Sequence, residues 1–331
     1  MKRKKKILVG CGALAGLAFL TCGGGYLWLR SWLSEAPEPL DGRRLAGPET
    51  RVILLYRAGE DDTGARELAR HLAKLLEEKG KFPEEARDMI GYLGYDNLPD
   101  FAEALLPITM GVLVDKDLGR VEFASFGRHA NPIARGIRYD LEKEGETLGE
   151  HDGTALFRTD DGCAAVKENT WFFATSQELL ETALDRAQDA APSREGAARH
   201  LDPSSPLTLS VEGDGDFLDR FLDQARDEKG VSFGESLRKN LDLTGRDFER
   251  CSFAGKVGVE SLEGDWLLVP AGASRTPRIA RSVDRLLAEL VRYYLSEGLD
   301  LEHQSRRSGD EIEVHWTLGN LDRFWQDVVA E

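Results

Sequence analysis

Residues 206–228 read PLTLSVEGDGDFLDRFLDQARDE, and this stretch decides the fold. Apolar residues at alternate positions predict a strand from Pro206 to Val211, and an acidic, glycine-containing turn follows it. Apolar residues at three-to-four spacing then predict a helix from Phe217 to Glu228. The same order occurs earlier, where Val52–Tyr56 predicts a strand and Ala65–Lys79 predicts a helix after another acidic turn. The chain therefore contains this strand–turn–helix unit twice, about 155 residues apart.

Later landmarks also repeat, at a shift of 145 residues. They are a glycine in a predicted hairpin turn, a capping residue followed by proline at a helix start, a tryptophan, and a capping residue before a final helix. The pairs are Gly119 with Gly264, Asn131-Pro132 with Thr276-Pro277, Trp171 with Trp316, and Thr175 with Asn320. Agreement of three kinds of landmark on one shift predicts an internal duplication.

The predicted fold class is α+β, because antiparallel hairpins alternate with helices that we expect on one face of the sheet. The long helix Pro277–Glu297 is typical of this class, with apolar residues along one side. We predict an N-terminal transmembrane helix followed by two similar antiparallel-sheet-plus-helix halves. The predicted boundaries are 1–6 for a basic tail, 7–29 for the membrane anchor, 30–50 for a linker, 51–188 for the first half, 189–205 for a connector, and 206–331 for the second half.

The anchor is predicted from Ile7–Leu29, which is 23 residues without one charge. At about 1.5 Å per residue, such a helix is roughly 34 Å long, enough to cross a hydrocarbon core of about 30 Å. The five basic residues at positions 2–6 favour an N-terminus inside the cell. The sequence thus predicts a single-pass protein of the cytoplasmic membrane with its C-terminal domain outside the cytoplasm.

Two alternatives stay open for this segment. Small residues at Thr21 and Gly23–Gly25 also suit a cleavable signal peptide, although Tyr26–Leu29 continue the apolar run. Gly12 and Gly16 form a small-xxx-small pair that would let two helices approach in a weak dimer, the alternative being no specific contact.

The region beyond the anchor is strongly acidic. The first 33 residues hold six basic and no acidic side chains, which leaves 37 basic against 59 acidic residues, a net charge of −22. Such a surface repels nucleic acid and anionic lipid headgroups, so we expect neither as a partner of the outer domain.

No pattern of catalytic or metal-binding residues stands out. The six histidines lack a second ligand at metal-binding spacing, and the acidic turns at 60–62 and 214–216 fit helix capping better than a calcium loop. The sequence predicts no cofactor and no metal, and leaves enzymatic activity uncertain, leaning against it. Cys163 and Cys251 lie in different halves, and they are either free buried thiols or a disulfide.

One segment differs between the halves. The connection Gly80–Pro107 is about ten residues longer than its counterpart and contains an apolar stretch broken by glycines. Since aromatic side chains often anchor partners, we predict a partner-binding role for Tyr92, Leu93 and Tyr95, against an ordinary short helix.

A lysine-rich start, one membrane helix, a proline-containing tether and a duplicated outer domain together resemble bacterial single-pass membrane-anchored envelope proteins of unassigned function. The resemblance rests on layout alone and implies topology, not activity. The leading hypothesis is a non-catalytic module that binds or scaffolds an unknown envelope protein. The alternatives are a carrier or sensor of an apolar ligand held between the halves, and a hydrolase with an unrecognised site.

Overall fold

The structure, a computed structural model, describes residues 40–59, 62–81, 90, 95–104, 106–117, 120–128, 131–160, 162–188, 193, 195–202, 204–213, 215–224, 235, 238–239, 241–296 and 298–330. Within these residues no helix combines the length and the apolar character needed to cross a membrane. The predicted anchor, residues 7–29, lies outside the described residues together with Gly12 and Gly16.

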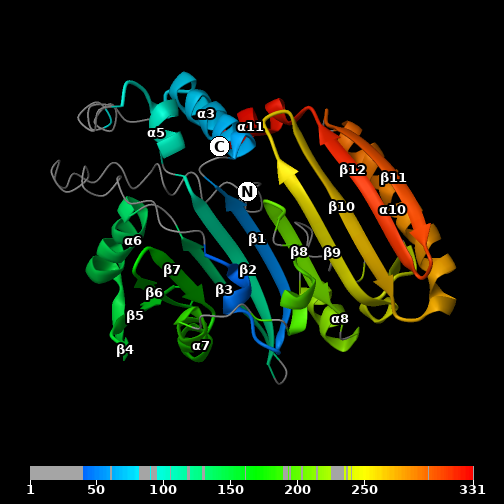
Figure 1. The fold of residues 1–331 in the computed structure, drawn as a ribbon, viewed down its shortest axis with the longest axis horizontal. Coiled ribbons are helices and arrows are strands. Elements are labelled where there is room, and N and C mark those ends of the chain that lie inside the picture. The colour runs from blue at the N-terminus through cyan, green and yellow to red at the C-terminus, as the bar shows by residue number, and fades with distance from the viewer. Residues whose placement is uncertain are drawn as a thin grey trace.

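The fold is α+β, with one large antiparallel sheet and several helices (Figure 1). The sheet has twelve strands in the order β11-β12-β10-β9-β8-β1-β2-β3-β7-β6-β5-β4. Their bounds are β1 Thr50–Ala58, β2 Ile108–Asp117, β3 Arg120–Arg128, β4 Glu146–His151, β5 Thr154–Thr159, β6 Gly162–Lys167, β7 Thr170–Ala174, β8 Leu207–Glu212, β9 Phe248–Val257, β10 Ser261–Pro270, β11 Asp300–Ser308 and β12 Glu311–Gly319.

Two of the predicted helices, Ala65–Lys79 and Pro277–Glu297, are present within two residues of their expected bounds, whereas the helix expected at Phe217–Glu228 is described as Gly215–Gln224. The α-helices are α3 Thr63–Glu78, α5 Leu98–Ala104, α6 Asn131–Glu144, α7 Gln177–Gln188, α8 Gly215–Gln224, α10 Thr276–Ser296 and α11 Leu321–Ala330. Short 3₁₀ turns are η2 Gly42–Leu45, η3 Gly196–His200, η4 Gly245–Asp247 and η5 Ala273–Arg275. Asp62 caps α3 as its acidic turn predicts, since its carboxylate accepts a hydrogen bond from Ala65 N at 3.0 Å.

One face of the sheet, called the α7 face, carries the largest core cluster. Residues in register on neighbouring strands share a face, so Leu55 of β1 lies beside Gly111 of β2, and Gly111 lies beside Phe126 of β3. A Cβ on Gly111 would come within 2.6 Å of both Leu55 and Phe126, so glycine lets these two side chains meet. Helix α7 and turns η2 and η3 cover this part of the face.

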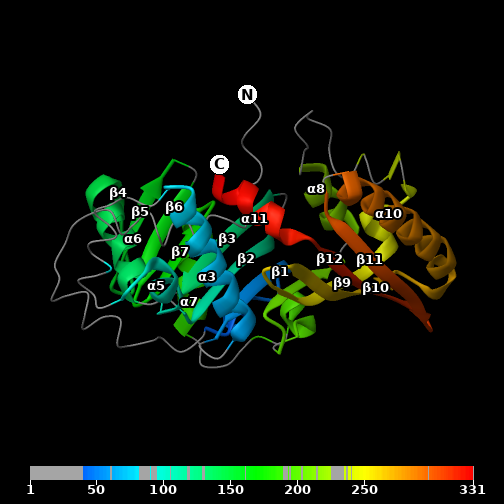
Figure 2. The same cartoon turned by 90° about the horizontal axis from the view of Figure 1, so that it is seen from above.

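The opposite face, called the α10 face, carries a row of side chains across the sheet. Leu54, Leu209, Phe253, Trp266 and Val314 are neighbours in register on β1, β8, β9, β10 and β12. Helix α10 packs over the far end of this row, while α6 packs over β6 and β7, opposite α7. Figure 2 shows α10 and α7 on opposite sides of the sheet.

The expectation of helices on one face is therefore wrong. Strand β6 is apolar on both faces, through Cys163 and Ala165 on one and Ala164 and Val166 on the other, and burying both needs a helix on each side. On β9 and β10, which follow β8 outward in the sheet, the α7 face carries polar side chains. Cross-strand ion pairs are exposed there, among them Lys256 Nζ–Glu263 Oε1 at 2.5 Å.

Strands β1 and β8 pair at the middle of the sheet, in a register where Leu54 faces Leu209. Read outward, the order is β1-β2-β3-β7-β6 on one side and β8-β9-β10-β12-β11 on the other, and the first side alone adds the hairpin β4–β5. Helices α6 and α10 begin at Asn131 and Thr276, as the 145-residue shift predicts.

Some predicted landmarks are wrong in detail. Gly264 does not lie in a hairpin turn: it pairs with Gly255 inside β10, and the chain turns at residues 258–260. The Phe253 ring fills the space where Cβ atoms of these two glycines would lie. At the start of α7 the Ser176 hydroxyl, one residue after the predicted cap Thr175, accepts a hydrogen bond from a first-turn amide, Leu179 N, at 3.3 Å. Asn320 has φ 62°, whereas an N-cap residue has extended backbone.

The predicted halves do not pack separately. Phe101 of α5 and Leu76 of α3, from the first half, share a buried cluster with Leu301 of β11, Leu318 of β12 and Trp325 of α11. Trp325 also donates a hydrogen bond from Nε1 to the carbonyl oxygen of Val259, at 2.9 Å. One core thus crosses the boundary expected at residues 189–205.

Candidate partner-binding surface

The middle of the α10 face carries apolar side chains that no described helix fully covers. Leu54 is 38% exposed, although it lies on a central strand. Its neighbours in register, Val112 on β2 and Leu209 on β8, are half-buried. The adjacent row of Met110, Tyr56 and Leu207 is also half-buried. We call these six residues the central patch.

Packed elements border the central patch on each side. Phe217 of α8 packs with Val52 and Val114 at one end of the central strands. Ala65 of α3 and Leu106 pack with Tyr56 at the other end. Helices α6 and α10 lie over the two outer parts of the same face. Within the part of the chain that the structure describes, the central patch is therefore a partly exposed apolar area between four covered regions.

The central patch is uncharged. Its single titratable residue is Tyr56, and burial, with a smaller effect from the Asp62 carboxylate, raises the pKa of Tyr56 to about 12. The phenol therefore stays protonated near neutral pH. A surface of this kind offers apolar contact and one hydroxyl.

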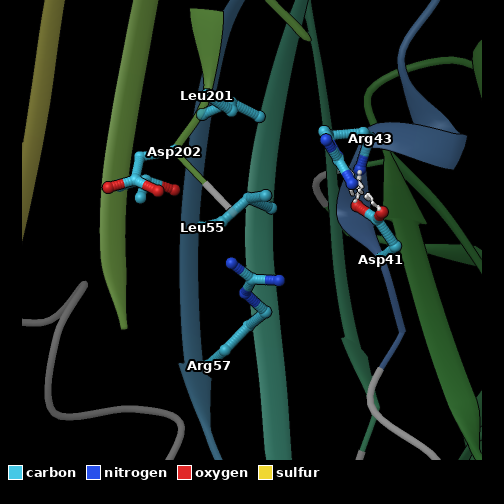
Figure 3. A pocket seen from close by; sticks show the side chains of 7 residues that line it. Asp41, Arg43, Leu55, Arg57, Leu201 and Asp202 are labelled. Carbon is cyan, nitrogen blue, oxygen red and sulfur yellow. Dashed lines mark hydrogen bonds and ion pairs between the residues drawn. The ribbon is translucent and has the colours of Figure 1, made fainter. Parts of the chain in front are cut away.

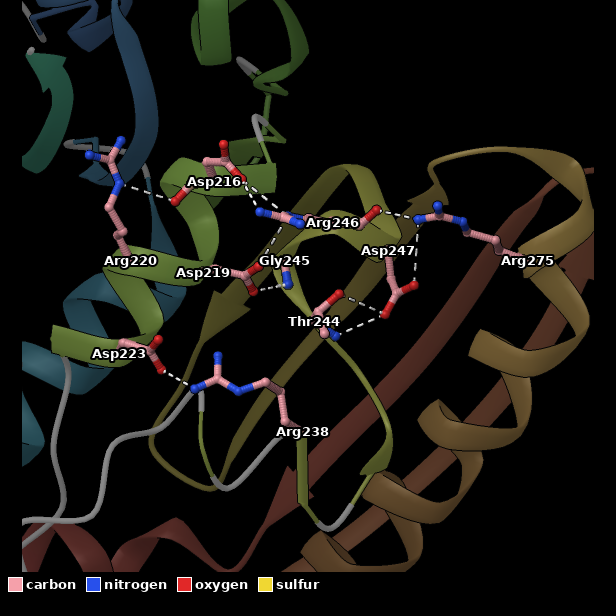
Figure 4. A network of polar contacts seen from close by, with 10 residues as sticks. All are labelled: Asp216, Asp219, Arg220, Asp223, Arg238, Thr244, Gly245, Arg246, Asp247 and Arg275. Carbon is pink, nitrogen blue, oxygen red and sulfur yellow. Dashed lines mark hydrogen bonds and ion pairs between the residues drawn. The ribbon is translucent and has the colours of Figure 1, made fainter. Parts of the chain in front are cut away.

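Polar contacts hold α8 at the border of the central patch (Figure 4). Arg246 binds Asp216 with an Nη2–Oδ1 distance of 2.6 Å, and Gly245 N donates to Asp219 Oδ1 at 2.5 Å. The buried Asp247 accepts from Thr244 N at 2.8 Å and pairs with Arg275 and Arg278. Asp216, from the acidic turn that offered a calcium alternative, is thus part of an ion-pair network, while Asp214 lies outside the described residues.

A small pocket lies on the α7 face (Figure 3). Its empty volume is about 160 Å³, and its lining residues are Asp41, Arg43, Leu55, Arg57, Leu201, Asp202 and Thr208. Burial disfavours the Asp41 carboxylate, but the hydrogen bonds and charge of Arg43 outweigh it and keep the pKa of Asp41 below its ordinary value. The pocket volume of about 160 Å³ includes space that is open to solvent, and the enclosed part leaves no room for a water-sized molecule. This pocket is too small and too charged for the apolar ligand of the alternative hypothesis.

Of the three predicted binding residues, the structure describes Tyr95, which does not belong to the central patch. Tyr92 and Leu93 are outside the described residues. Tyr95 is half-buried and packs edge-to-face on Phe101, with ring centroids 5.4 Å apart, in the cluster shared with Trp325. Burial raises the pKa of Tyr95. In the structure Tyr95 packs against the core that α3, α5 and α11 build.

The sequence analysis missed the central patch because Val52–Tyr56 is apolar throughout, which is typical of a strand buried on both faces. A signal existed in β8. There Leu207, Leu209 and Val211 alternate with Thr208 and Ser210, so one face of a central strand is apolar and the other polar.

The two cysteines outside the predicted anchor are free. Cys163 lies on β6 in the α7-face core, whereas Cys251 pairs in register with Val211 on the α10 face. The two strands are six positions apart in the sheet, about 29 Å at the usual strand spacing. The disulfide alternative is therefore wrong for one chain. Burial raises the pKa of the Cys251 thiol to about 12, which makes the thiol unreactive.

Comparison with protein-family models found no match, and neither did comparison with curated proteins. Among solved structures, the chain is similar to crystal forms of a protein named TP0453. Form IV has a TM-score of 0.42 and 12% identity over 91% of this chain and 99% of that chain. Form III has a TM-score of 0.45 and 11% identity over 89% and 100%. A likeness at these values carries no inference about fold, function or location.

Proposed function

We propose that the chain is a membrane-anchored extracytoplasmic module that binds a protein partner through the central patch. The observation that carries this proposal is the 38% exposure of Leu54 at the centre of a twelve-stranded sheet, inside a continuous apolar row. Exposed apolar patches on soluble domains commonly mark interaction surfaces. An apolar-ligand carrier would instead need an enclosed cavity.

The partner that fits is a protein segment with apolar side chains on one side and basic residues beside them. The apolar side chains would cover Leu54, Val112 and Leu209. The basic residues would complement a region whose net charge is −22 beyond position 33. A second copy of this chain carries the same negative charge and is the less suitable occupant.

The location rests on the uncharged stretch Ile7–Leu29 and the basic residues before it. Alkaline phosphatase fused after Glu331 should be active in cells, and a reporter that works only in the cytoplasm should be inactive there. The opposite pattern would contradict the location. Recovery of a soluble form that begins near Tyr26 would show that the segment is cleaved.

Binding is tested by replacing an exposed leucine with a residue that strands tolerate. Leu54→Thr should reduce recovery of the partner from solubilised membranes by about tenfold, as expected for loss of an interface anchor. Leu295→Thr is the matched control, because Leu295 is 65% exposed on α10, away from the central patch. Equal recovery with both variants, after circular dichroism has shown that both are folded, would contradict the proposal.

We also infer that the two sides of the sheet descend from one duplicated unit. Support comes from the shared strand order outward from β1 and β8 and from helices that start 145 residues apart. If so, the Leu54–Leu209 pair marks the local twofold axis, since these residues are 155 positions apart and face each other. The central patch would then have formed where the two copies joined.

A further inference from the structure

A histidine and two aspartates meet where the hairpin β4–β5 touches α7. His151 ends β4, Asp152 follows in the turn, and Asp185 lies on α7. His151 Nε2 is 2.6 Å from Asp185 Oδ1, and one ligand atom from each of the three residues lies within 4.8 Å of the others. Asp152 also accepts from Gln188 Nε2, at 3.4 Å.

The local backbone positions these groups. Asp152 has φ 47° and Gly153 has φ 75°, which makes the turn tight and places Asp152 directly beside His151. A register shift between Thr147 and Gly149 bends β4 before this turn. The hairpin has no counterpart among the strands on the β8 side of the sheet, so the site belongs to an addition on one side.

We propose that His151, Asp152 and Asp185 bind one transition-metal dication of the zinc class, with water completing the coordination. An imidazole nitrogen with carboxylate oxygens suits zinc and its neighbours, whereas calcium and magnesium prefer oxygen ligands alone. Zinc bonds of about 2.0–2.2 Å bring ligand atoms to roughly 3.5 Å from each other. The ligand atoms now lie within 4.8 Å of one another, and the Asp185 side chain is 56% exposed, which gives it room to adjust.

The charges around His151 favour a dication. The hydrogen bond to Asp185, with the charges of Asp185, Asp152 and Glu181, raises the pKa of His151. The same carboxylates would stabilise a dication bound at Nε2. A bound metal would join the β4–β5 hairpin to α7.

The chain supplies a matched control. His315 Nδ1 lies 2.9 Å from Asp265 Oδ1 on neighbouring strands, in an equally simple His–Asp pair. Among the described residues, this pair has no third ligand group close enough to form a metal site. Metal binding that needs a third ligand, here the second carboxylate, should therefore distinguish the two pairs.

The test is equilibrium dialysis of the full chain in detergent against Zn²⁺, with metal counted by mass spectrometry. We expect the parent chain to bind one ion at the site. His151→Ala and Asp185→Asn should each bind Zn²⁺ at least about tenfold more weakly than the parent chain does. His315→Ala should bind as the parent chain does. With Co²⁺, the parent should show a visible d–d band that Asp152→Asn reduces. Unchanged binding in the site variants, or equal loss in His315→Ala, would overturn the proposal.

Discussion

The burial of Asp115 needs an explanation, because this carboxylate is only 5% exposed on the central strand β2. Thr50 Oγ1 donates to Asp115 Oδ1 at 2.5 Å, and Arg186 Nη1 donates to Asp115 Oδ2 at 3.2 Å. Arg186 also pairs with Glu49 and donates to the carbonyl oxygen of Leu45 at 3.1 Å. A buried carboxylate is tolerated when it is paired and hydrogen-bonded. This network ties residues 45–50 to the sheet and to α7.

Removing the Arg186 guanidinium should therefore lower the free energy of unfolding. Arg186→Met removes the cation that pairs with the buried Asp115 carboxylate, and we expect a loss of about 3 kcal/mol in the free energy of unfolding. Adding Asp115→Asn should restore part of it, since the uncompensated charge is gone. Urea denaturation measures both. A loss below about 1 kcal/mol in the single variant would show that water solvates Asp115.

At the scale of elements, helices were predictable and some strands were not. The apolar periodicity of α3 and α10 is regular over 16 and 21 residues, so their bounds could be predicted within two residues. The hairpin β9–β10 was placed wrongly because Gly264 was interpreted as a turn residue, whereas its role is to accommodate the Phe253 ring. A glycine required by packing from another strand leaves no local sign in the sequence.

The candidate site could not be predicted from the sequence, for a similar reason. The neighbours of β1 in the sheet are strands far from it in sequence, and the exposure of Leu54 depends on which elements pack beside these strands. The cluster of His151, Asp152 and Asp185 likewise depends on a hairpin touching a helix 34 residues away in sequence. Spacing rules for metal ligands do not detect such a group.

The buried cluster to which α3, α5 and α11 all contribute is the element-scale feature with the clearest consequence. Phe101 is fully buried, and Trp325 is in the same cluster although the two residues come from opposite predicted halves. Phe101→Ala and Trp325→Ala should each cost about 3–5 kcal/mol. Because both side chains line one cluster, the double variant should lose less than the sum, by roughly 0.5 kcal/mol or more. Strict additivity in urea denaturation would show that the two helices pack independently.

At the scale of the whole molecule, two sets of contacts join the halves. One is the pairing of strands β1 and β8, and the other is the buried cluster that contains Phe101 and Trp325. We therefore expect residues 40–205 and 206–331, expressed separately, to be unfolded or aggregated, since each would expose a central strand edge and half of a core. Mixing the two should restore structure. Sharp thermal transitions for either segment alone, measured by circular dichroism, would instead support two independent domains.

The central claim is that the middle of the α10 face holds a protein partner in the cell envelope. A photo-crosslinking amino acid in place of Leu54 in intact cells tests it most directly, with the same substitution at Leu295 as the control. We expect irradiation to link position 54 to one discrete protein at a segment rich in apolar and basic residues, and position 295 to give no such product. A crosslink to lipid, to a second copy of the chain, or to nothing would contradict the proposal.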